Sequence, residues 1–294
     1  MKTLAWLTFA ILIAAAPARA QRYTAVQGAE VVTLSDRTAD TVVTVVPSVG
    51  NIAVEMKVKG HNVLRYPQGS VAEFKARPGN TGIPFMGPWA NRLDEQAFYA
   101  NGRRHAFDME LGNVRGAVPI HGFITTTNLW RVTSVVATAN GASVTSRLDF
   151  YKQPAWMRQW PYAHTIDMTY RLSGGVLEVL TTITNLSDEP MPVSVGFHPY
   201  FQLTDSPRDE WTISVGARTR WVLDSRKVPT GATEPAAVLF PQARAPLRDY
   251  NLDDVFGDLV RDNQGRATMT VWGKAQRLDV VMGPRYRSAV VWAP

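Results

Sequence analysis

The chain has 294 residues, no cysteine and a formal net charge of +6. The lack of cysteine excludes disulfides as a source of stability, so the fold must depend on its hydrophobic core, which a chain of this length can build. Lysine and arginine are scattered rather than clustered, which argues against nucleic acid and anionic membrane surfaces as partners.

Residues 1–20 have the pattern of a secretory signal peptide. Lys2 gives a positive start, residues 4–16 form an apolar run, and Ala18 and Ala20 fit a small-x-small cleavage site. The apolar run is shorter than the about 20 residues that span a bilayer. We therefore expect export to the periplasm and removal of residues 1–20. Residues 21–294 would then be a single domain that is not attached to a membrane.

Segments rich in alternating, β-branched or aromatic residues follow, and turn signals separate them. Strands are expected at 42–46, 52–58, 142–150, 165–172 and 267–273. Turn signals, several of them Asn-Gly or Gly-Gly, lie at 48–51, 100–103, 139–142, 172–175, 185–190 and 262–265. No stretch of twelve or more residues has a helical apolar period. The pattern predicts an all-β protein, one large antiparallel β-sandwich rather than a small barrel.

Residues 82–103 predict an irregular loop that leads into a hairpin. The loop is rich in glycine and proline, carries Phe85, Met86 and Trp89, and then delivers Asn91 and Arg92. Aromatic rings suit the apolar faces of a sugar, and a planar amide with a guanidinium suits its hydroxyls. A salt bridge of Arg92 beneath a packed loop fits this stretch equally well.

Five histidines could carry acid–base chemistry. His61 and His105 lie beside turns among polar residues, which indicates the surface, and His164 precedes a strand without a clear role. His121 precedes a glycine that would let the backbone bend closely around a ligand.

His198 ends a strand expected to run through residues 193–197. Ser194 and Gly196 share its face, and their small side chains would leave room beside the imidazole. This strand therefore predicts a ligand lying against the sheet next to His198.

Residues 242–256 are expected to form the longest loop. It contains adjacent carboxylates, Asp253 and Asp254. Taken alone, such a pair more often makes a turn or a cap than a site.

Four motifs in order resemble the aldose 1-epimerase (mutarotase) family: NRL with Arg92, PIHGF with His121, HPYFQL with His198 and LDDVF with Asp253. The resemblance covers most of the chain from about residue 25 onward. It implies a galactose mutarotase-like β-sandwich and an isomerase that interconverts α and β anomers of a free aldohexose, with no metal, nucleotide or redox cofactor.

The resemblance also implies roles for individual residues. His198 would be the general acid, and His121 would hydrogen-bond near the ring oxygen. Arg92 and Asp253 would bind sugar hydroxyls, and we expect Asn91 and Tyr200 to contact the sugar as well. A histidine titrates near pH 6.5, so it can exchange a proton with a sugar at neutral pH.

One family feature is missing. Family members use a glutamate near the C-terminus, usually followed by proline, as the base on the C1 hydroxyl. Here the last glutamate is Glu234, which precedes Asp253 instead of following it. We therefore do not give it the role of the base. A fragment that ends one strand short of the base is favoured over a relative that has lost it.

Alternatives remain at this stage. A mutarotase for hexose 6-phosphates is disfavoured by export and by the lack of a basic cluster near the motifs, whereas a non-catalytic sugar-binding protein fits the missing glutamate. A zinc hydrolase using His121, His198 and Asp253 lacks the usual short ligand spacing. A purely structural domain of an envelope complex would leave the ordered motifs as a coincidence.

Overall fold

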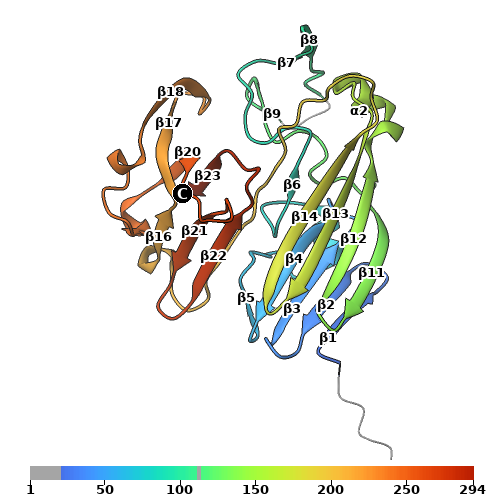
Figure 1. The fold of residues 1–294 in the computed structure, drawn as a ribbon, viewed down its shortest axis with the longest axis vertical. Helices are drawn as coiled ribbons and strands as arrows, with labels where there is room; N and C mark the ends of the chain where they lie inside the picture. Colours follow the sequence, from blue (N-terminus) through green and yellow to red (C-terminus); the bar gives the residue numbers. More distant parts are fainter. Residues whose placement is uncertain (1–20, 111–113) are drawn as a thin grey trace, which may run out of the picture.

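The computed structural model describes residues 21–110 and 114–294, which form an antiparallel, nearly all-β fold. Figure 1 shows two groups of strands: β1–β5 and β11–β14 on one side, and β16–β23 on the other. The signal peptide expected at residues 1–20 lies outside the described residues, and the single-domain assignment stays a prediction.

The first group is a sandwich of two sheets whose strands all pair antiparallel. One sheet contains β1 (Tyr23–Gln27), β2 (Val32–Asp36), β3 (Thr41–Val46), β4 (Ile52–Val58) and β5 (His61–Asn62). The other contains β11 (Arg131–Thr138), β12 (Gly141–Asp149), β13 (His164–Ser173) and β14 (Val176–Asn185). Alternate residues of β13, such as Met168 and Tyr170, are fully buried between the sheets, as the two-residue period of a strand requires.

The second group has its own core. Its sheets are β19 (Ala245–Pro246), β16 (Thr212–Val215), β21 (Ala267–Trp272) and β22 (Arg277–Met282), and β18 (Pro229–Pro235), β17 (Ala217–Leu223), β20 (Leu252–Leu259) and β23 (Ala289–Ala293). Leu252, Phe256 and Val291 are buried in this core. Because they alternate with other residues of β20 and β23, the opposite face of these two strands is free to contribute to a site.

The remaining elements are short and lie in the connections between these strands. The strands are β6 (Phe85–Met86), β7 (Ala97–Ala100), β8 (Arg103–Ala106), β9 (Val114–Arg115), β10 (Val118–Pro119) and β15 (Gly196–Phe197). The helices are α1 (Val71–Ala76) and α2 (Pro154–Gln159), with 3-10 turns at Phe150–Lys152, Arg208–Glu210, Ala236–Val238 and Leu247–Asp249. None of the described helices is long and apolar enough to cross a membrane.

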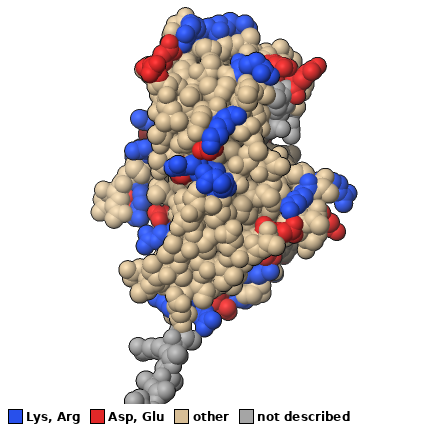
Figure 2. Space-filling view, turned by 90° about the vertical axis from the view of Figure 1, so that its right-hand side faces the viewer, with Lys and Arg blue, Asp and Glu red and all other residues tan. Residues whose placement is uncertain are grey.

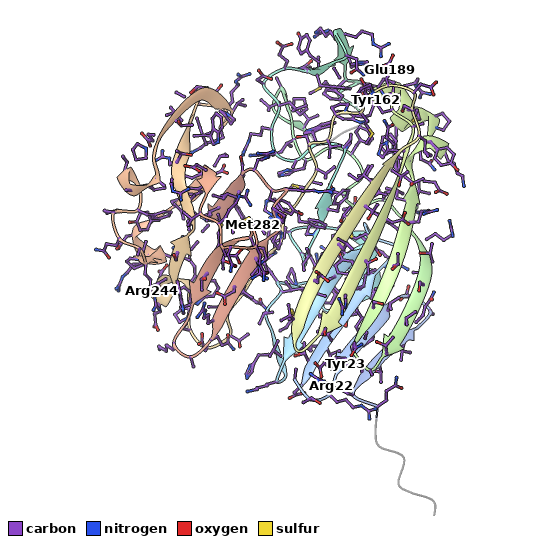
Figure 3. All side chains as sticks on the ribbon, viewed as in Figure 1. Arg22, Tyr23, Tyr162, Glu189, Arg244 and Met282 are labelled. Carbon is purple, nitrogen blue, oxygen red and sulfur yellow. The ribbon has the colours of Figure 1, made fainter. Side chains whose placement is uncertain are left out.

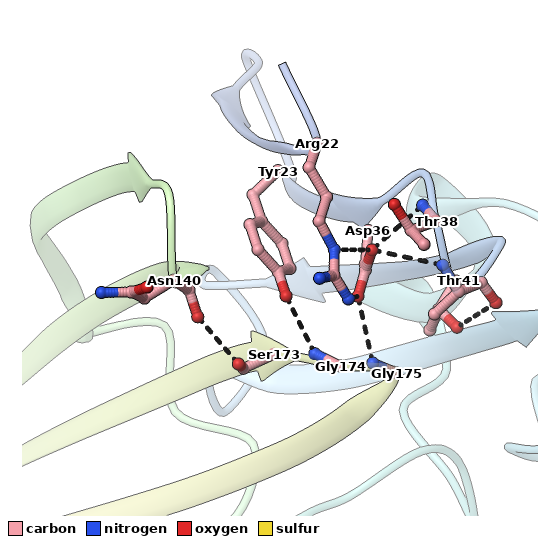
Figure 4. Close-up of polar contacts among 10 residues, drawn as sticks. Arg22, Tyr23, Asp36, Thr38, Thr41, Asn140, Ser173, Gly174 and Gly175 are labelled. Atoms are coloured by element: carbon pink, nitrogen blue, oxygen red, sulfur yellow. Dashed lines mark hydrogen bonds and ion pairs between the residues drawn. The ribbon is translucent and has the colours of Figure 1, made fainter. Parts of the chain in front are cut away.

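Polar contacts tie the ends of the sandwich. Arg22 and Tyr23 lie at the end where the described chain begins, and Tyr162 and Glu189 lie at the opposite end (Figure 3). Asp36, which is fully buried, receives hydrogen bonds from the Arg22 guanidinium and from the backbone of the β13–β14 turn at Gly175 (Figure 4). The two sheets are therefore joined by hydrogen bonds as well as by apolar packing.

Most of the strand predictions are confirmed. The five expected strands are present with ends within about a residue, and the hairpin turns at 48–51, 100–103, 139–142 and 172–175 connect consecutive strands. The predicted loop at 242–256 is wrong in its last part, because Leu252 begins β20. Two charged residues follow Leu252, so the alternation of apolar and polar residues that is typical of a strand is not visible between Leu252 and Phe256.

Charges are interspersed on the visible surface. Figure 2 shows lysine and arginine lying close to aspartate and glutamate, with broad uncharged areas between them. The face seen in Figure 2 thus has no extended patch of one sign.

Candidate functional site

His198 is placed by a pair of very short strands. β15 pairs with β6, and main-chain hydrogen bonds continue past the C-terminal end of β15, because the His198 N–H donates to Pro84 O (2.9 Å) and the Tyr200 N–H donates to Gly82 O (2.8 Å). The irregular loop predicted at 82–103 thus serves as the partner of the segment that carries His198. Glycine and proline limit how far either strand can extend, so the imidazole lies just beyond the pairing.

His121 is held by a close approach of two backbones. His121 and Gly122 both have a φ of +60°. A Cβ on Gly122 would lie 1.9 Å from Gly87 O, so only glycine fits there. The bend brings His121 beside Asn91: the Asn91 N–H donates to His121 Nδ1 (3.1 Å), and the His121 N–H donates to Asn91 O (3.0 Å). With Nδ1 accepting, the neutral imidazole carries its proton on Nε2.

The two histidine rings lie side by side. Their centroids are 5.3 Å apart, and the ring planes are nearly perpendicular at 87°. Two imidazoles, each able to give or accept a proton, therefore lie within the reach of one small molecule.

Arg92 and Asp253 form the charged part of the site. Arg92 Nη2 donates to Asp253 Oδ2 (3.2 Å), and Arg92 Nη1 donates to Asn91 Oδ1 (3.3 Å). The Arg92 side chain is only 8% exposed and that of Asp253 is 23% exposed, so little water screens the pair. The ion pair joins the loop that holds His121 to β20, which belongs to the second group of strands.

Asp254 and Glu234 lie on the other face of this sheet. Asp254 follows Asp253 in β20 and therefore points the opposite way, toward the side of Leu252 and Phe256. There Arg220 forms ion pairs with both Asp254 and Glu234, each at 3.1 Å. Glu234 is thus engaged in an ion pair with Arg220, away from the histidine pair.

Two aromatic rings border His198. Tyr200 stacks on the imidazole with centroids 4.5 Å apart, and its hydroxyl donates to Asn80 Oδ1 (3.1 Å). The Trp292 ring stands 6.4 Å from His198 and 6.3 Å from Tyr200, steeply inclined to both. Sequence reasoning missed Trp292. The sequence around Trp292 is apolar and typical of a strand. It does not show that this strand pairs with β20, which carries Asp253.

Burial determines the electrostatics of His198. The loss of hydration lowers its pKa below 6.5, whereas hydrogen bonding with its own backbone and the negative charge of Asp253 act in the opposite direction. The net direction is downward, so the ring is mostly neutral at pH 7. The site is therefore not permanently charged at its acid–base group.

Two details of the predicted surroundings are wrong. The strand at 193–197 is only Gly196–Phe197, with Val193 exposed. Gly196 does not leave an empty space, because a Cβ there would meet Ala90 at 2.9 Å and Met86 at 3.2 Å. The reason for glycine is thus close packing of the loop at 82–103 against the strand.

The other histidines lie apart from this pair. His61 is exposed and contacts Thr204, whereas His105 is partly buried and stacks on Phe98, so its predicted surface position is wrong. His164 is buried, with its Nδ1 2.7 Å from Tyr162 O, and it has a structural position. Within residues 21–110 and 114–294, no group of three or more His, Cys, Asp or Glu could hold a metal ion.

The chain is similar to one protein family and to several solved structures. A family model described as Aldose 1-epimerase matches residues 30–294. A galactose mutarotase-like protein from Clostridium acetobutylicum is 24% identical, with a TM-score of 0.78 over 92% of this chain and 83% of that chain. A galactose 1-epimerase from Lactobacillus acidophilus is 16% identical, with a TM-score of 0.69 over 87% and 77% of the two chains. At these identities, the similarity to solved structures is one of fold.

Proposed function

Because the chain belongs to the aldose 1-epimerase family, we propose that it interconverts the α and β anomers of a free aldohexose. The observation that carries this proposal is the convergence of His121 and His198, with rings 5.3 Å apart, beside the Arg92–Asp253 ion pair. We further propose that the protein acts in the periplasm after removal of residues 1–20.

The chemistry assigns a task to each group. Anomers interconvert when the hemiacetal opens, rotates about the C1–C2 bond and closes on the other face. Opening needs a proton at the ring oxygen, which the protonated form of His198 supplies, and loss of the C1 hydroxyl proton, which solvent water takes up in this proposal because no residue is assigned as the base. His121 donates a hydrogen bond from Nε2 near the same ring oxygen. Arg92 and Asp253 offer one donor group and one acceptor group to neighbouring hydroxyls. The proposal does not use Glu234, whose carboxylate pairs with Arg220 on the opposite face.

Polarimetry of freshly dissolved α-galactose and α-glucose tests the proposal. The buffer must be dilute, because buffer ions catalyse the same reaction. We expect the protein to accelerate the change in optical rotation, and the variant His198→Ala to lose about 10²–10⁴-fold of the rate. The matched control is His61→Ala, an exposed histidine that contacts Thr204. Equal rates for wild type and His198→Ala would refute the role of His198.

A folded protein that binds galactose without accelerating its mutarotation would be a sugar-binding relative. Calorimetric titration with galactose, carried out on the same preparation, separates this result from a failure to bind.

A further inference from the structure

Trp292 is an exposed aromatic ring beside the proposed acid. It keeps 44% of its surface accessible, although a tryptophan is usually largely buried. Tyr99 and Tyr151 are the other strongly exposed aromatic residues among those the structure describes, and the ring contacts of His198 include Trp292 but neither of these tyrosines. Trp292 thus combines a partly accessible indole with a ring contact to His198.

The strand pairing gives Trp292 its direction. Trp292 in β23 lies directly opposite Asp253 in β20, and directly opposed residues project from the same face of a sheet. Asp253 points from that face toward Arg92, so the indole projects from the same face. Val291, the preceding residue, points into the core of the second group of strands and anchors the strand.

The ring orientations give the indole a specific relation to His198. The Trp292 plane is inclined by 68° to the imidazole and by 83° to Tyr200, whereas Tyr200 and His198 stack nearly parallel at 16°. One face of the imidazole is thus covered by Tyr200, and the indole forms a wall at a steep angle to the stack. A flat molecule stacked on the indole would also lie at a steep angle to the imidazole.

We propose that Trp292 is the platform on which the apolar face of the pyranose lies. This inference rests on the proposed function. The face of an aromatic ring carries partial negative charge, which attracts the weakly positive C–H groups of a sugar. A pyranose that lies on the indole and is held at its hydroxyls by Arg92 and Asp253 turns the ring-oxygen edge toward the histidines.

The platform also discriminates between sugars. In galactose the hydrogens on C3, C4 and C5 lie on one face and form a continuous apolar patch, whereas in glucose the hydrogen on C4 lies on the opposite face. Removal of the indole should therefore weaken the use of galactose more than that of glucose.

Steady-state mutarotation kinetics of Trp292→Ala, with both sugars, test the proposal. A stacking contact stabilises the bound sugar and the transition state equally, so it acts on KM and leaves kcat unchanged. We expect KM for galactose to rise about tenfold, which is the effect of about 1.4 kcal/mol. KM for glucose should rise less. Trp292→Phe keeps a ring and should stay close to wild type.

The matched control is Trp272→Ala in β21. That indole packs against the guanidinium groups of Arg244 and Arg277 at 4.4 and 5.8 Å, on the other sheet of the second group. Its removal should leave KM for galactose unchanged. A fall in kcat with an unchanged KM in Trp292→Ala would mean that the indole only supports the position of His198, and it would overturn the proposal.

Binding of methyl β-galactopyranoside separates this proposal from the proposed function. This glycoside cannot mutarotate, so calorimetric titration measures its binding whether or not the protein is an epimerase. A rise of about tenfold in Kd for Trp292→Ala, but not for Trp292→Phe, would support the platform even without catalysis. An unchanged Kd in Trp292→Ala would overturn it. Circular dichroism melting curves confirm that each variant is folded.

Discussion

The substitution Asp36→Asn should lower the free energy of unfolding by about 2–3 kcal/mol at neutral pH. The Asp36 carboxylate accepts two hydrogen bonds from Arg22 and further ones from the N–H groups of Thr38, Ala39 and Gly175 (Figure 4). The hydrogen bonds from Arg22 contribute most to the fall of its pKa from 3.8 to about 2. That shift corresponds to roughly 2.4 kcal/mol, because one pKa unit is about 1.36 kcal/mol.

The pH dependence of this stability follows from the direction of the shift. A carboxylate with a lowered pKa stabilises the folded state fully above its unfolded pKa of 3.8, and the contribution is lost as the pH falls toward about 2. Urea unfolding of wild type and Asp36→Asn should therefore differ most near pH 7, and the difference should shrink toward pH 2.

Asp258→Asn is the matched control for this substitution. Asp258 pairs with Arg218, but both side chains are more than half exposed, so the control should cost less than about 1 kcal/mol. A loss for Asp36→Asn as small as that of the control, or one that does not change with pH, would refute the reasoning.

Three further predictions concern the site. The kcat/KM of wild type should fall as the pH rises through the pKa of His198, which burial holds below 6.5, and this limb should be absent from the pH profile of His198→Asn. Asp253→Asn should raise KM about tenfold or more by losing a charge-assisted hydrogen bond to the sugar, and an unchanged KM in polarimetric assays would exclude the contact. Gly122→Ala should lower the midpoint of thermal unfolding much more than Gly102→Ala does. Both glycines have a positive φ, but only Gly122 lies against another backbone segment. Equal losses would mean that backbone strain alone, about 1–2 kcal/mol, explains the effect.

The sequence predicts the long strands well because their burial is one-sided. In β13, Ile166, Met168 and Tyr170 point into the sandwich while Thr169 and Arg171 on the other face are not buried, and this period of two is visible in the sequence. Asn-Gly and Gly-Gly turns then fix which strands are neighbours. Local signals therefore suffice for the sheets formed by consecutive strands.

The surroundings of the site are less predictable because they depend on contacts between distant segments. Gly196 and Gly122 are small for the same reason, the close approach of another segment, and neither partner can be recognised from the residues next to it. Trp292 gains its place beside His198 only through the pairing of β23 with β20. The four family motifs name the polar residues of the site, but Trp292 lies in none of them, and its place in the site is visible only in the structure.

The site depends on two separately packed groups of strands. His121 and His198 lie on loops attached to the sandwich, whereas Asp253 and Trp292 lie on β20 and β23, whose buried residues belong to a different core. The Arg92–Asp253 ion pair and the contacts between Trp292, His198 and Tyr200 connect the two. The acid–base groups and the proposed sugar platform therefore lie next to each other only when the second group of strands packs against the loops of the first. The geometry of the site is thus a property of that docking and not of either core alone.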